Sequence, residues 1–311
     1  MFSRFSIPAI LILCTSCGGP DRNQPAAGAA TKPAVYVVNY PLQYFAERIA
    51  GDAVDVVFPA PNDVDPAYWK PSDKQIRTFQ SADVIVLNGA DYAKWTSRVS
   101  LPRSKVVNTS KAFADDLLVV EDLVVHRHGP DGEHAHSGTA MHTWLDPQQA
   151  IEQAAAIAAE LAKRLADQAA EFQKNLDELK QDLTELDRSL TASITDIADT
   201  NMLASHPVYH YLARRCDWEL TSFHWEPDEM PAEDEWEKLK SLMGERPGRW
   251  LMLWEDTPVA EIADRLKSLE VEVVVFRPCG NAPNEGDFLT EMRANIARLE
   301  RSIAKQESVE H

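Results

Sequence analysis

The sequence predicts an α/β protein with two β/α lobes of mainly parallel sheet, joined by a single long helix, with a ligand cleft between the lobes. First, short β-rich runs alternate with helical patterns, which is typical of parallel strands connected by helices. Second, this alternation occurs twice, before and after a long helical stretch without glycine. Third, a length of 311 residues suits two domains.

In the first half, β-branched and apolar runs at 34–40, 53–60, 83–89 and 105–110 indicate strands. The stretches 41–51 and 72–82 between them have helical patterns. Ser72 is followed three residues later by Gln75, which is the pattern of a capping box. This side-chain pattern predicts a helix that begins directly after Ser72.

The middle of the chain, from Asp146 to about Ile197, predicts the linking helix. It contains no glycine, and its proline is at the start. Leucines recur at three- and four-residue steps and define one apolar face: Leu176, Leu179, Leu183, Leu186 and Leu190. Such a pattern is also typical of a coiled coil, but the flanking β/α sequence favours a helix that joins two lobes.

In the second half we expect strands at 201–206, 218–223, 249–256 and 271–278, and helices near 207–215, 232–243, 258–269 and 288–305. We therefore divide the chain into a signal segment at 1–17, a tether at 18–33, an N-terminal lobe at 34–146, a helical segment at 147–197 and a C-terminal lobe at 198–311.

The N-terminus has the pattern of a secretory signal: Arg4, an apolar run from Ile7 to Leu13, and small residues before Cys17. The run is too short to span a bilayer. The stretch "LCTSC" resembles a bacterial lipobox, which predicts an exported protein lipid-anchored through Cys17, in the periplasm or on the outer face of a membrane. The alternative is cleavage by an ordinary signal peptidase, with Cys17 a plain thiol. The tether that follows is rich in Gly, Pro and Ala.

Two further cysteines, Cys216 and Cys279, lie in the body of the chain. In an oxidising compartment they either pair or remain as two buried thiols, because the sequence does not report the distance between them.

The formal net charge is −18, from 31 Lys and Arg against 49 Asp and Glu. Such a surface repels phosphates, so we expect no nucleic-acid partner. An acidic surface also concentrates cations, although acidity is commonly a matter of solubility alone.

Two histidines are candidate metal ligands by position. His142 precedes the helix start at Asp146, and His206 ends a predicted strand. Because ligands collect at the carboxyl ends of strands in α/β sheets, we expect one histidine from each lobe to face the cleft. Neutral imidazole is a common zinc ligand, but a lone histidine is more often a surface or core residue.

Nearly all of the chain after the tether resembles the zinc- and manganese-binding lipoproteins of bacterial ABC importers, in which one long helix links two β/α lobes. The residues that carry the resemblance are "DVDPAYWKPSDKQIRTFQSADVIVLNGADYAKW" (63–95), the histidine-rich stretch that ends in "MHTWLDP" (126–147), "SHPVYHYLARR" (205–215) and "VEVVVFRPCGNAPNEGDFLTEMRANIARLERSI" (271–303). The resemblance implies that His142 and His206 match the second and third metal ligands of the family. It also implies an ABC permease as partner, and we expect a monomer.

The other two ligand positions of the family are substituted. Its first ligand is a histidine in a D-P-H stretch, where this chain has Ala67. Its fourth is an acidic residue, where this chain has Arg277. Alanine has no donor atom, and guanidinium stays protonated without an acceptor.

Three explanations remain open for the substituted site. A metal binds through His142 and His206, and other groups complete its shell, with Asp65, Glu255 and His210 as candidates. Alternatively, Arg277 binds an anion or a metal chelate through bidentate hydrogen bonds. In the third explanation, Arg277 pairs with a cleft carboxylate in a degenerate site.

The resemblance also implies zinc as the cargo, with Mn²⁺ a weaker expectation, because a histidine at the third position points to zinc in this family. A loop at 126–142 holds further histidines that we expect to be exposed and to contact zinc: His126, His128, His134 and His136. The alternative is a solvated polar loop.

Other classes of function have less support. Two histidines and Glu255 around a metal would in principle activate water. The chain nevertheless has no H-E-x-x-H, G-x-S-x-G or phosphate-binding glycine-rich motif, so we expect a binding protein and no enzyme. A surface metal buffer without a transport role is the remaining alternative.

Overall fold

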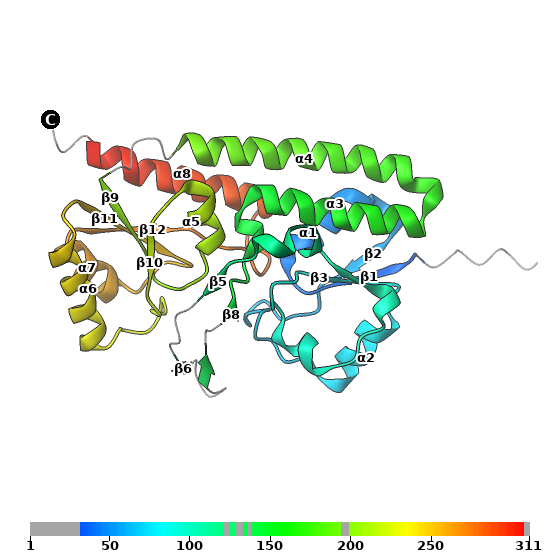
Figure 1. Ribbon diagram of the computed structural model, residues 1–311, viewed down its shortest axis with the longest axis horizontal. Coiled ribbons are helices and arrows are strands. Elements are labelled where there is room, and N and C mark those ends of the chain that lie inside the picture. The colour runs from blue at the N-terminus through cyan, green and yellow to red at the C-terminus, as the bar shows by residue number, and fades with distance from the viewer. Residues whose placement is uncertain (1–31, 121–124, 128–132, 136–137, 194–198, 308–311) are drawn as a thin grey trace, which may run out of the picture. The chain divides into compact units, whose positions relative to one another are not determined.

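The protein is described by a computed structural model that covers residues 32–120, 125–127, 133–135, 138–193 and 199–307 (Figure 1). Contacts divide the chain into Met1–Lys32 and a compact unit at Pro33–His311, which holds every element described below. The signal segment, Cys17 and almost all of the tether lie outside the described residues. Within the described part, no helix is both long and apolar enough to cross a membrane.

The N-terminal sheet contains four parallel strands among the described residues, in the order β2-β1-β3-β4. These strands are β1 (Ala34–Val37), β2 (Asp55–Val57), β3 (Val84–Leu87) and β4 (Val106–Asn108). Two helices accompany them, α1 (Tyr40–Ala50) and α2 (Asp73–Ser81). The capping box of Ser72 and Gln75 is present at the start of α2, as the sequence predicts.

The C-terminal sheet repeats this arrangement within the described residues, in the order β10-β9-β11-β12, again all parallel. Its strands are β9 (Thr200–Ala204), β10 (Leu220–Ser222), β11 (Arg249–Trp254) and β12 (Val271–Val275). Its helices are α5 (His210–Cys216), α6 (Glu233–Glu245), α7 (Ala260–Ser268) and α8 (Phe288–Glu307). The two-sheet α/β class that the sequence predicts is confirmed.

The predicted long helix is a pair of helices, α3 (Pro147–Arg164) and α4 (Ala169–Ala192). They pack side by side (Figure 1). The break is at Leu165, whose φ of −124° and ψ of 63° leave the helical region, and a short 3-10 turn at Ala166–Gln168 follows. An unbroken helix over 147–192 would be about 70 Å long. Folding back instead lets the buried alanines of α3 pack against α4.

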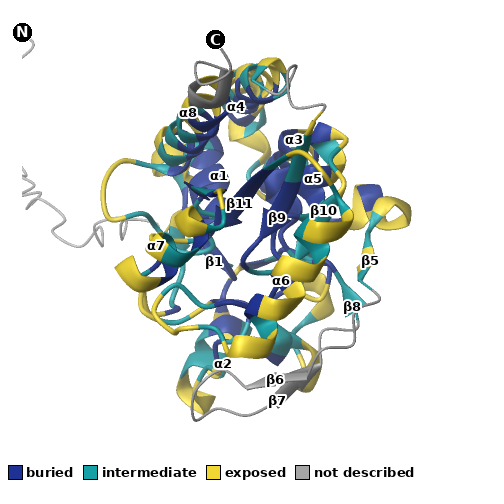
Figure 2. Cartoon of the chain, turned by 90° about the vertical axis from the view of Figure 1, so that its left-hand side faces the viewer, coloured by how far each residue is buried: buried dark blue, intermediate teal, exposed yellow. Residues whose placement is uncertain are grey.

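The predicted leucine face of α4 is confirmed, because all five of its leucines are buried. α4 also packs against α1 and α8. One large core cluster includes residues from both sheets and these helices, and Figure 2 shows β1, β9 and β11 as buried. A second cluster, rich in tryptophan, packs α6 and α7 onto the C-terminal sheet.

The histidine-rich loop contains short antiparallel strands. β5 (Val119–Val120) pairs with β8 (Gly138–Thr139), and β6 (Val125–Arg127) pairs with β7 (Glu133–Ala135), with His126 opposite His134. His128 and His136 lie outside the described residues.

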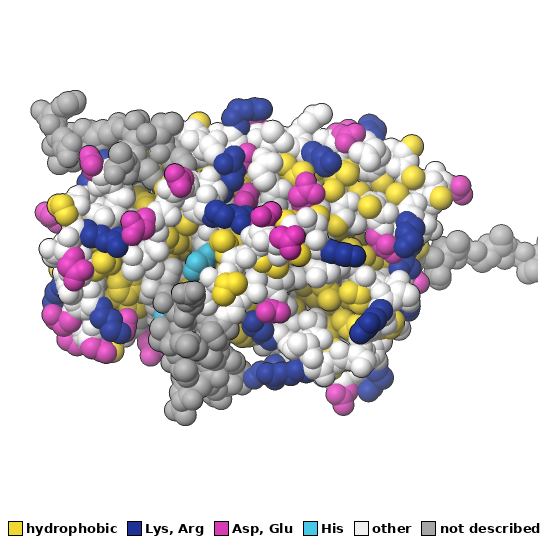
Figure 3. Space-filling model, viewed as in Figure 1, with side chains coloured by type: hydrophobic (Ala, Val, Ile, Leu, Met, Phe, Trp, Pro, Cys, Tyr) yellow, Lys and Arg dark blue, Asp and Glu magenta, His cyan; other side chains and the backbone are white. Residues whose placement is uncertain are grey.

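Short 3-10 helices complete the described structure, at Gly51–Ala53, Lys94–Arg98, Arg103–Lys105, Lys111–Asp116 and Thr143–Leu145. On the face in Figure 3, acidic and basic side chains are interspersed, so the net negative charge does not gather in one patch there.

Cys216 and Cys279 are both buried and free. Burial raises the pKa of each thiol to about 12, so little thiolate exists at neutral pH. We therefore expect non-reducing peptide mapping of the native protein to find both as unmodified thiols that alkylate only after unfolding. A peptide that joins the two cysteines would contradict this structure.

Candidate metal centre

The candidate site begins where central strands of both sheets end. In each sheet, the first strand along the chain lies between the second and the third, so connections leave in opposite directions from that point. Such switch points are the usual ligand positions in open α/β sheets. His206 lies two residues after β9, and Glu255 directly follows β11. The strand-end rule therefore placed both residues correctly.

His206 is held by the backbone of the C-terminal sheet. The N–H of Ser205 donates to Leu253 at 2.8 Å, and the carbonyl of Ser205 accepts from Trp225 at 2.7 Å. The side chain of His206 is 12% exposed, and its Nδ1 lies 3.7 Å from Oε1 of Glu226. Its ring centroid is 5.4 Å from that of His224.

Sequence reasoning did not single out Glu226. The signal was available, because "FHWE" directly follows β10, and β10 is the neighbour of β9 in the sheet. Side chains after adjacent parallel strands meet at one edge. His224 belongs to the same stretch, so the carboxyl edge carries two histidines and two glutamates.

His142 reaches the site from the other side, at the end of the segment that follows β8. It is 8% exposed, and its ring packs edge-on against Trp144 and Tyr92, with centroid distances of 5.2 and 6.0 Å. Burial, with a smaller effect from His206 and His210, lowers its pKa to about 3. The imidazole is therefore neutral at physiological pH, which is the form that binds a metal.

A buried polar cluster centred on Asn88 fixes the backbone next to His142. The Asn88 amide donates to the carbonyl of Met141 at 3.0 Å. Its Oδ1 accepts from Asn39 at 3.2 Å and from Gln153 at 3.0 Å, and Thr143 donates to it at 3.4 Å. Because Asn88 directly follows β3, the N-terminal sheet sets the position of His142 through this amide.

The two sheet edges meet through direct contacts. Trp144 donates its indole N–H to the carbonyl of Pro278 at 2.6 Å, and the N–H of Tyr40 donates to Gly280 at 2.9 Å. Asn281 donates to the carbonyl of Val64 at 2.8 Å. The segment after β12 therefore lies against the N-terminal sheet beside His142.

Carboxylates also converge on the site. Burial, with smaller effects from the charges of Asp65 and Glu226, raises the pKa of Glu255 to about 8. Asp65 accepts the N–H of Ala67 at 2.8 Å. The charges of Asp65 and Glu226, which disfavour ionisation of Glu255, form a region of negative potential that favours a cation.

Ala67 is fully buried, and its carbonyl accepts from the N–H of Lys94 at 2.9 Å. It contributes no side-chain donor, as expected. Arg277 lies at the end of β12 and pairs with Asp256 at 2.8 Å and Glu291 at 3.5 Å. Two carboxylates already neutralise its guanidinium, which fits the explanation in which Arg277 is an ion-pair partner.

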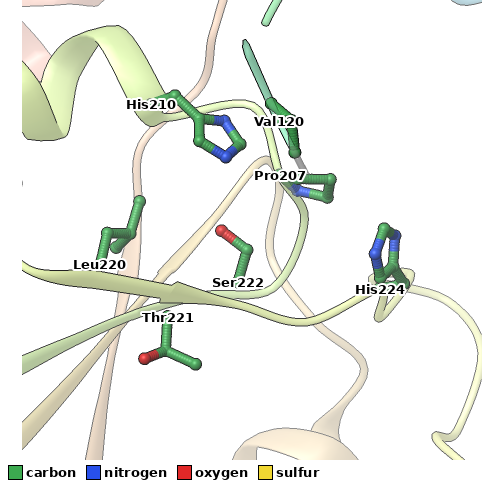
Figure 4. Close-up of a pocket in the computed structure, with 7 residues that line it drawn as sticks. All are labelled: Val120, Pro207, His210, Leu220, Thr221, Ser222 and His224. Carbon is green, nitrogen blue, oxygen red and sulfur yellow. The ribbon is translucent and has the colours of Figure 1, made fainter. Parts of the chain in front are cut away.

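His210 begins α5 and lines a pocket of about 210 Å³ with Ser222 and His224 (Figure 4). Val120, Pro207, Leu220 and Thr221 complete the lining. The charge of His210 contributes to the lowered pKa of His142, after burial and the charge of His206. His210 therefore lies on the wall of a pocket that shares His224 with the edge of the candidate site.

Within the described residues, no group of three or more His, Cys, Asp or Glu side chains is arranged to hold a metal ion. The structure brings His142, His206, Asp65 and Glu255 into electrostatic range without a closed cage. The assignment of these residues as ligands remains a prediction. The side chains of the four loop histidines are outside what the structure describes.

Two parallel sheets of the same strand order, packed on a shared pair of helices, define an α/β solute-binding fold. The family model described as "Zinc-uptake complex component A periplasmic" (ZnuA) matches residues 35–302. The chain belongs to the ZnuA family, whose members are solute-binding proteins. The family resemblance inferred from the motifs is confirmed.

Curated relatives agree with this assignment. The chain is 26% identical over 267 residues to the high-affinity zinc uptake system protein ZnuA of Bacillus subtilis, covering 85% of this chain and 83% of that protein. It is 28% identical over 179 residues to the zinc-binding lipoprotein AdcA of Streptococcus pneumoniae, covering 56% of this chain but only 35% of AdcA.

Solved structures share the fold. The metal-dependent lipoprotein YcdH of Bacillus subtilis matches with a TM-score of 0.73 and 23% identity, over 87% of this chain and 98% of that one. The Zn(II)-bound ZnuA-like domain of Streptococcus pneumoniae AdcA matches with a TM-score of 0.72 and 20% identity, over 87% and 98%. The FpvC protein of Pseudomonas aeruginosa in complex with Mn²⁺ matches with a TM-score of 0.70 and 19% identity, over 89% and 100%.

Proposed function

We propose that this protein is the extracytoplasmic binding component of an ABC importer, which captures Zn²⁺ between its two sheets and delivers it to a permease. The observation that carries the proposal is the neutral, buried imidazole of His142 near His206, at a site where the charges of Asp65 and Glu226 act on Glu255. Imidazole suits zinc better than manganese, so Mn²⁺ is the weaker candidate.

The binding mode is that of an open site. His142 and His206 supply the two nitrogen ligands, and Asp65 or Glu255 is available as a further oxygen ligand. His210 lines the neighbouring pocket with Ser222 and His224 and is a further candidate nitrogen ligand. Two or three protein ligands leave positions for water, as in open zinc sites, so we expect weaker binding than in a closed four-ligand site.

The alternative in which Arg277 binds an anion or a chelate has less support. The guanidinium of Arg277 is already paired with Asp256 and Glu291, and an incoming anion would have to displace one of them. A membrane anchor through Cys17 and a monomeric state belong to the proposal, by likeness to lipoprotein relatives. The domain division inferred from the sequence also stands as a proposal.

The test is zinc titration by calorimetry in a background where Ala replaces His126, His128, His134 and His136, which removes loop binding. We expect the parent to bind about one zinc at micromolar levels. His142→Ala with His206→Ala is expected to bind at least about tenfold more weakly, a loss of about 1.4 kcal/mol or more. His311→Ala, at the C-terminus, is the control for losing a histidine elsewhere.

An unchanged titration in the double variant would contradict the two-histidine site. Import and buffering are separated in cells that lack the protein. Zinc accumulation inside the cell, restored by the parent but not by the double variant, supports import. Restoration of surface-bound zinc alone would support a metal buffer.

A further inference from the structure

The segment that follows β3 has a strained backbone that positions Tyr92. Gly89, Ala90, Asp91 and Ala93 all have positive φ, at 77°, 49°, 57° and 50°. Non-glycine residues rarely adopt this conformation, and clusters of it often mark functional sites. The N–H of Tyr92 donates to the carbonyl of Gly89 at 3.0 Å, which closes the turn.

Tyr92 is 4% exposed, and its hydroxyl has no hydrogen-bond partner among the described residues. Other buried tyrosines of this chain are satisfied: Tyr209 donates to Phe276 at 2.8 Å, and Tyr211 donates to Ala140 at 3.1 Å. A buried hydroxyl without a partner costs free energy, so such groups are rare and call for an explanation.

The ring of Tyr92 lies beside His142 of the candidate metal centre. The ring packs edge-on against His142 and Trp144, at centroid distances of 6.0 and 5.3 Å. A Cβ added to Gly280 would lie 3.2 Å from the hydroxyl, which is a tight contact, so the hydroxyl lies directly beside Gly280. Burial, followed by the charges of Asp65 and Glu255, raises the pKa of Tyr92, so the hydroxyl keeps its proton.

We propose that the Tyr92 hydroxyl accepts a hydrogen bond from a water molecule bound to the divalent cation at His142 and His206. This inference rests on the proposed function and names how the missing ligands are replaced. Ala67 provides no donor, so water completes the coordination shell. A cation polarises its bound water and makes it a strong hydrogen-bond donor, which a neutral phenol oxygen accepts.

Tyr92 is therefore a positioning residue for the hydrated cation. Residues that hydrogen-bond to the ligands of a metal, and not to the metal itself, change metal affinity by about 10–100-fold in known sites. We expect Tyr92→Phe to weaken zinc binding by about tenfold in the full-length protein, measured by calorimetry with zinc alone in a non-chelating buffer. The cargo-free variant is expected to melt at the same temperature as the wild type or higher, because it lacks the unsatisfied hydroxyl.

Tyr44→Phe is the matched control. The Tyr44 hydroxyl accepts from Arg48 at 2.7 Å, away from the metal centre. Its loss is expected to lower the melting temperature and leave zinc affinity unchanged. If Tyr92 had only a structural role, Tyr92→Phe would change the melting temperature and leave zinc affinity unchanged. We instead expect weaker zinc binding without a loss of melting temperature for Tyr92→Phe, and the reverse pattern for Tyr44→Phe.

Gly280→Ala provides a second variant that keeps the hydroxyl and fills the space beside it. We expect weaker zinc binding in the wild-type background and a smaller effect when Phe replaces Tyr92. Wild-type zinc affinity in Tyr92→Phe would overturn the inference while leaving the two-histidine site intact. Absence of zinc binding by the wild type would overturn the proposed function, and this inference with it.

Discussion

Replacing Ala67 with His and Arg277 with Asp together is expected to tighten zinc binding by about a hundredfold, or about 2.7 kcal/mol. No three described side chains of the ligand types are now arranged to hold a metal. The double variant adds an imidazole beside Asp65 and a carboxylate at the end of β12. These are the two positions that the family resemblance assigns to ligands, so the two-histidine site becomes a four-ligand site.

The same variant is expected to be less stable without zinc. Ala67 is fully buried, and a larger side chain at a packed position typically costs about 1–3 kcal/mol. Removing the guanidinium of Arg277 also leaves Asp256 and Glu291 beside a third carboxylate. Because zinc binds only the folded state, added zinc is expected to raise the melting temperature more in the variant than in the wild type.

Calorimetry and thermal melts, each with and without zinc, measure the two effects. Ala67→Leu with Arg277→Asn is the matched control, because it fills the same space without an imidazole or a carboxylate. If both double variants bind zinc equally, positions 67 and 277 do not face the cargo, and the site has been remodelled around other residues.

The sheets could be predicted because the alternation of β-rich and helical patterns is local. All eight predicted strands are present, and their C-terminal edges carry His206 and Glu255 as the strand-end rule requires. The helix break at Leu165 could not be predicted, because "KRLADQA" contains neither Gly nor Pro. The packing of α3 against α4 accompanies this break, and the local sequence does not report that packing.

The starting residues of helices also depend on contacts that the local sequence does not report. Thr257 and Pro258 have the pattern of a helix start, yet α7 begins at Ala260. The N–H of Val259 donates to the carbonyl of Pro227 at 2.8 Å, and this contact accompanies an extended Val259 with a ψ of 152°. A residue distant in sequence thus fixes where the helix begins.

At the candidate site, sequence reasoning singled out two histidines but could not describe their surroundings. His142 and His206 stand in recognisable motifs, whereas the partners of Arg277 lie 21 and 14 residues away. The unsatisfied hydroxyl of Tyr92 is a property of burial, which no local pattern reports. The ion pairs of Arg277, which bear on the three explanations for the substituted site, were likewise not visible in the sequence.

Without cargo, the stability of the fold is expected to decrease by about 2 kcal/mol between pH 6.5 and pH 8 because of Glu255. Its pKa is raised from 4.5 to about 8 in the folded protein. In this interval the unfolded chain has already lost the proton while the folded protein retains it. The folded state therefore binds more protons, and its stability falls as pH rises.

His142 acts in the opposite direction at lower pH. Its pKa is lowered from 6.5 to about 3, so the unfolded chain takes up a proton first, and stability falls as pH falls through that range. Between pH 4.5 and 6.5 the two effects oppose each other. Between pH 6.5 and 8 the effect of Glu255 is the larger of the two, because the unfolded His142 is at most half protonated there. Urea unfolding at several pH values in this interval, in the wild type and in a variant without the Glu255 carboxyl, measures it.

Glu255→Gln is expected to remove the decrease, because the amide does not titrate. The control is Glu178→Gln, at a carboxyl that is 57% exposed on α4 and should leave the decrease unchanged. Saturating zinc should also remove it in the wild type, since a nearby cation favours the ionised carboxylate. An equal decrease in the wild type and in Glu255→Gln would mean that Glu255 is ionised in the cargo-free protein. The negative potential of the site would then be present before the cation arrives, and capture would not be coupled to loss of a proton.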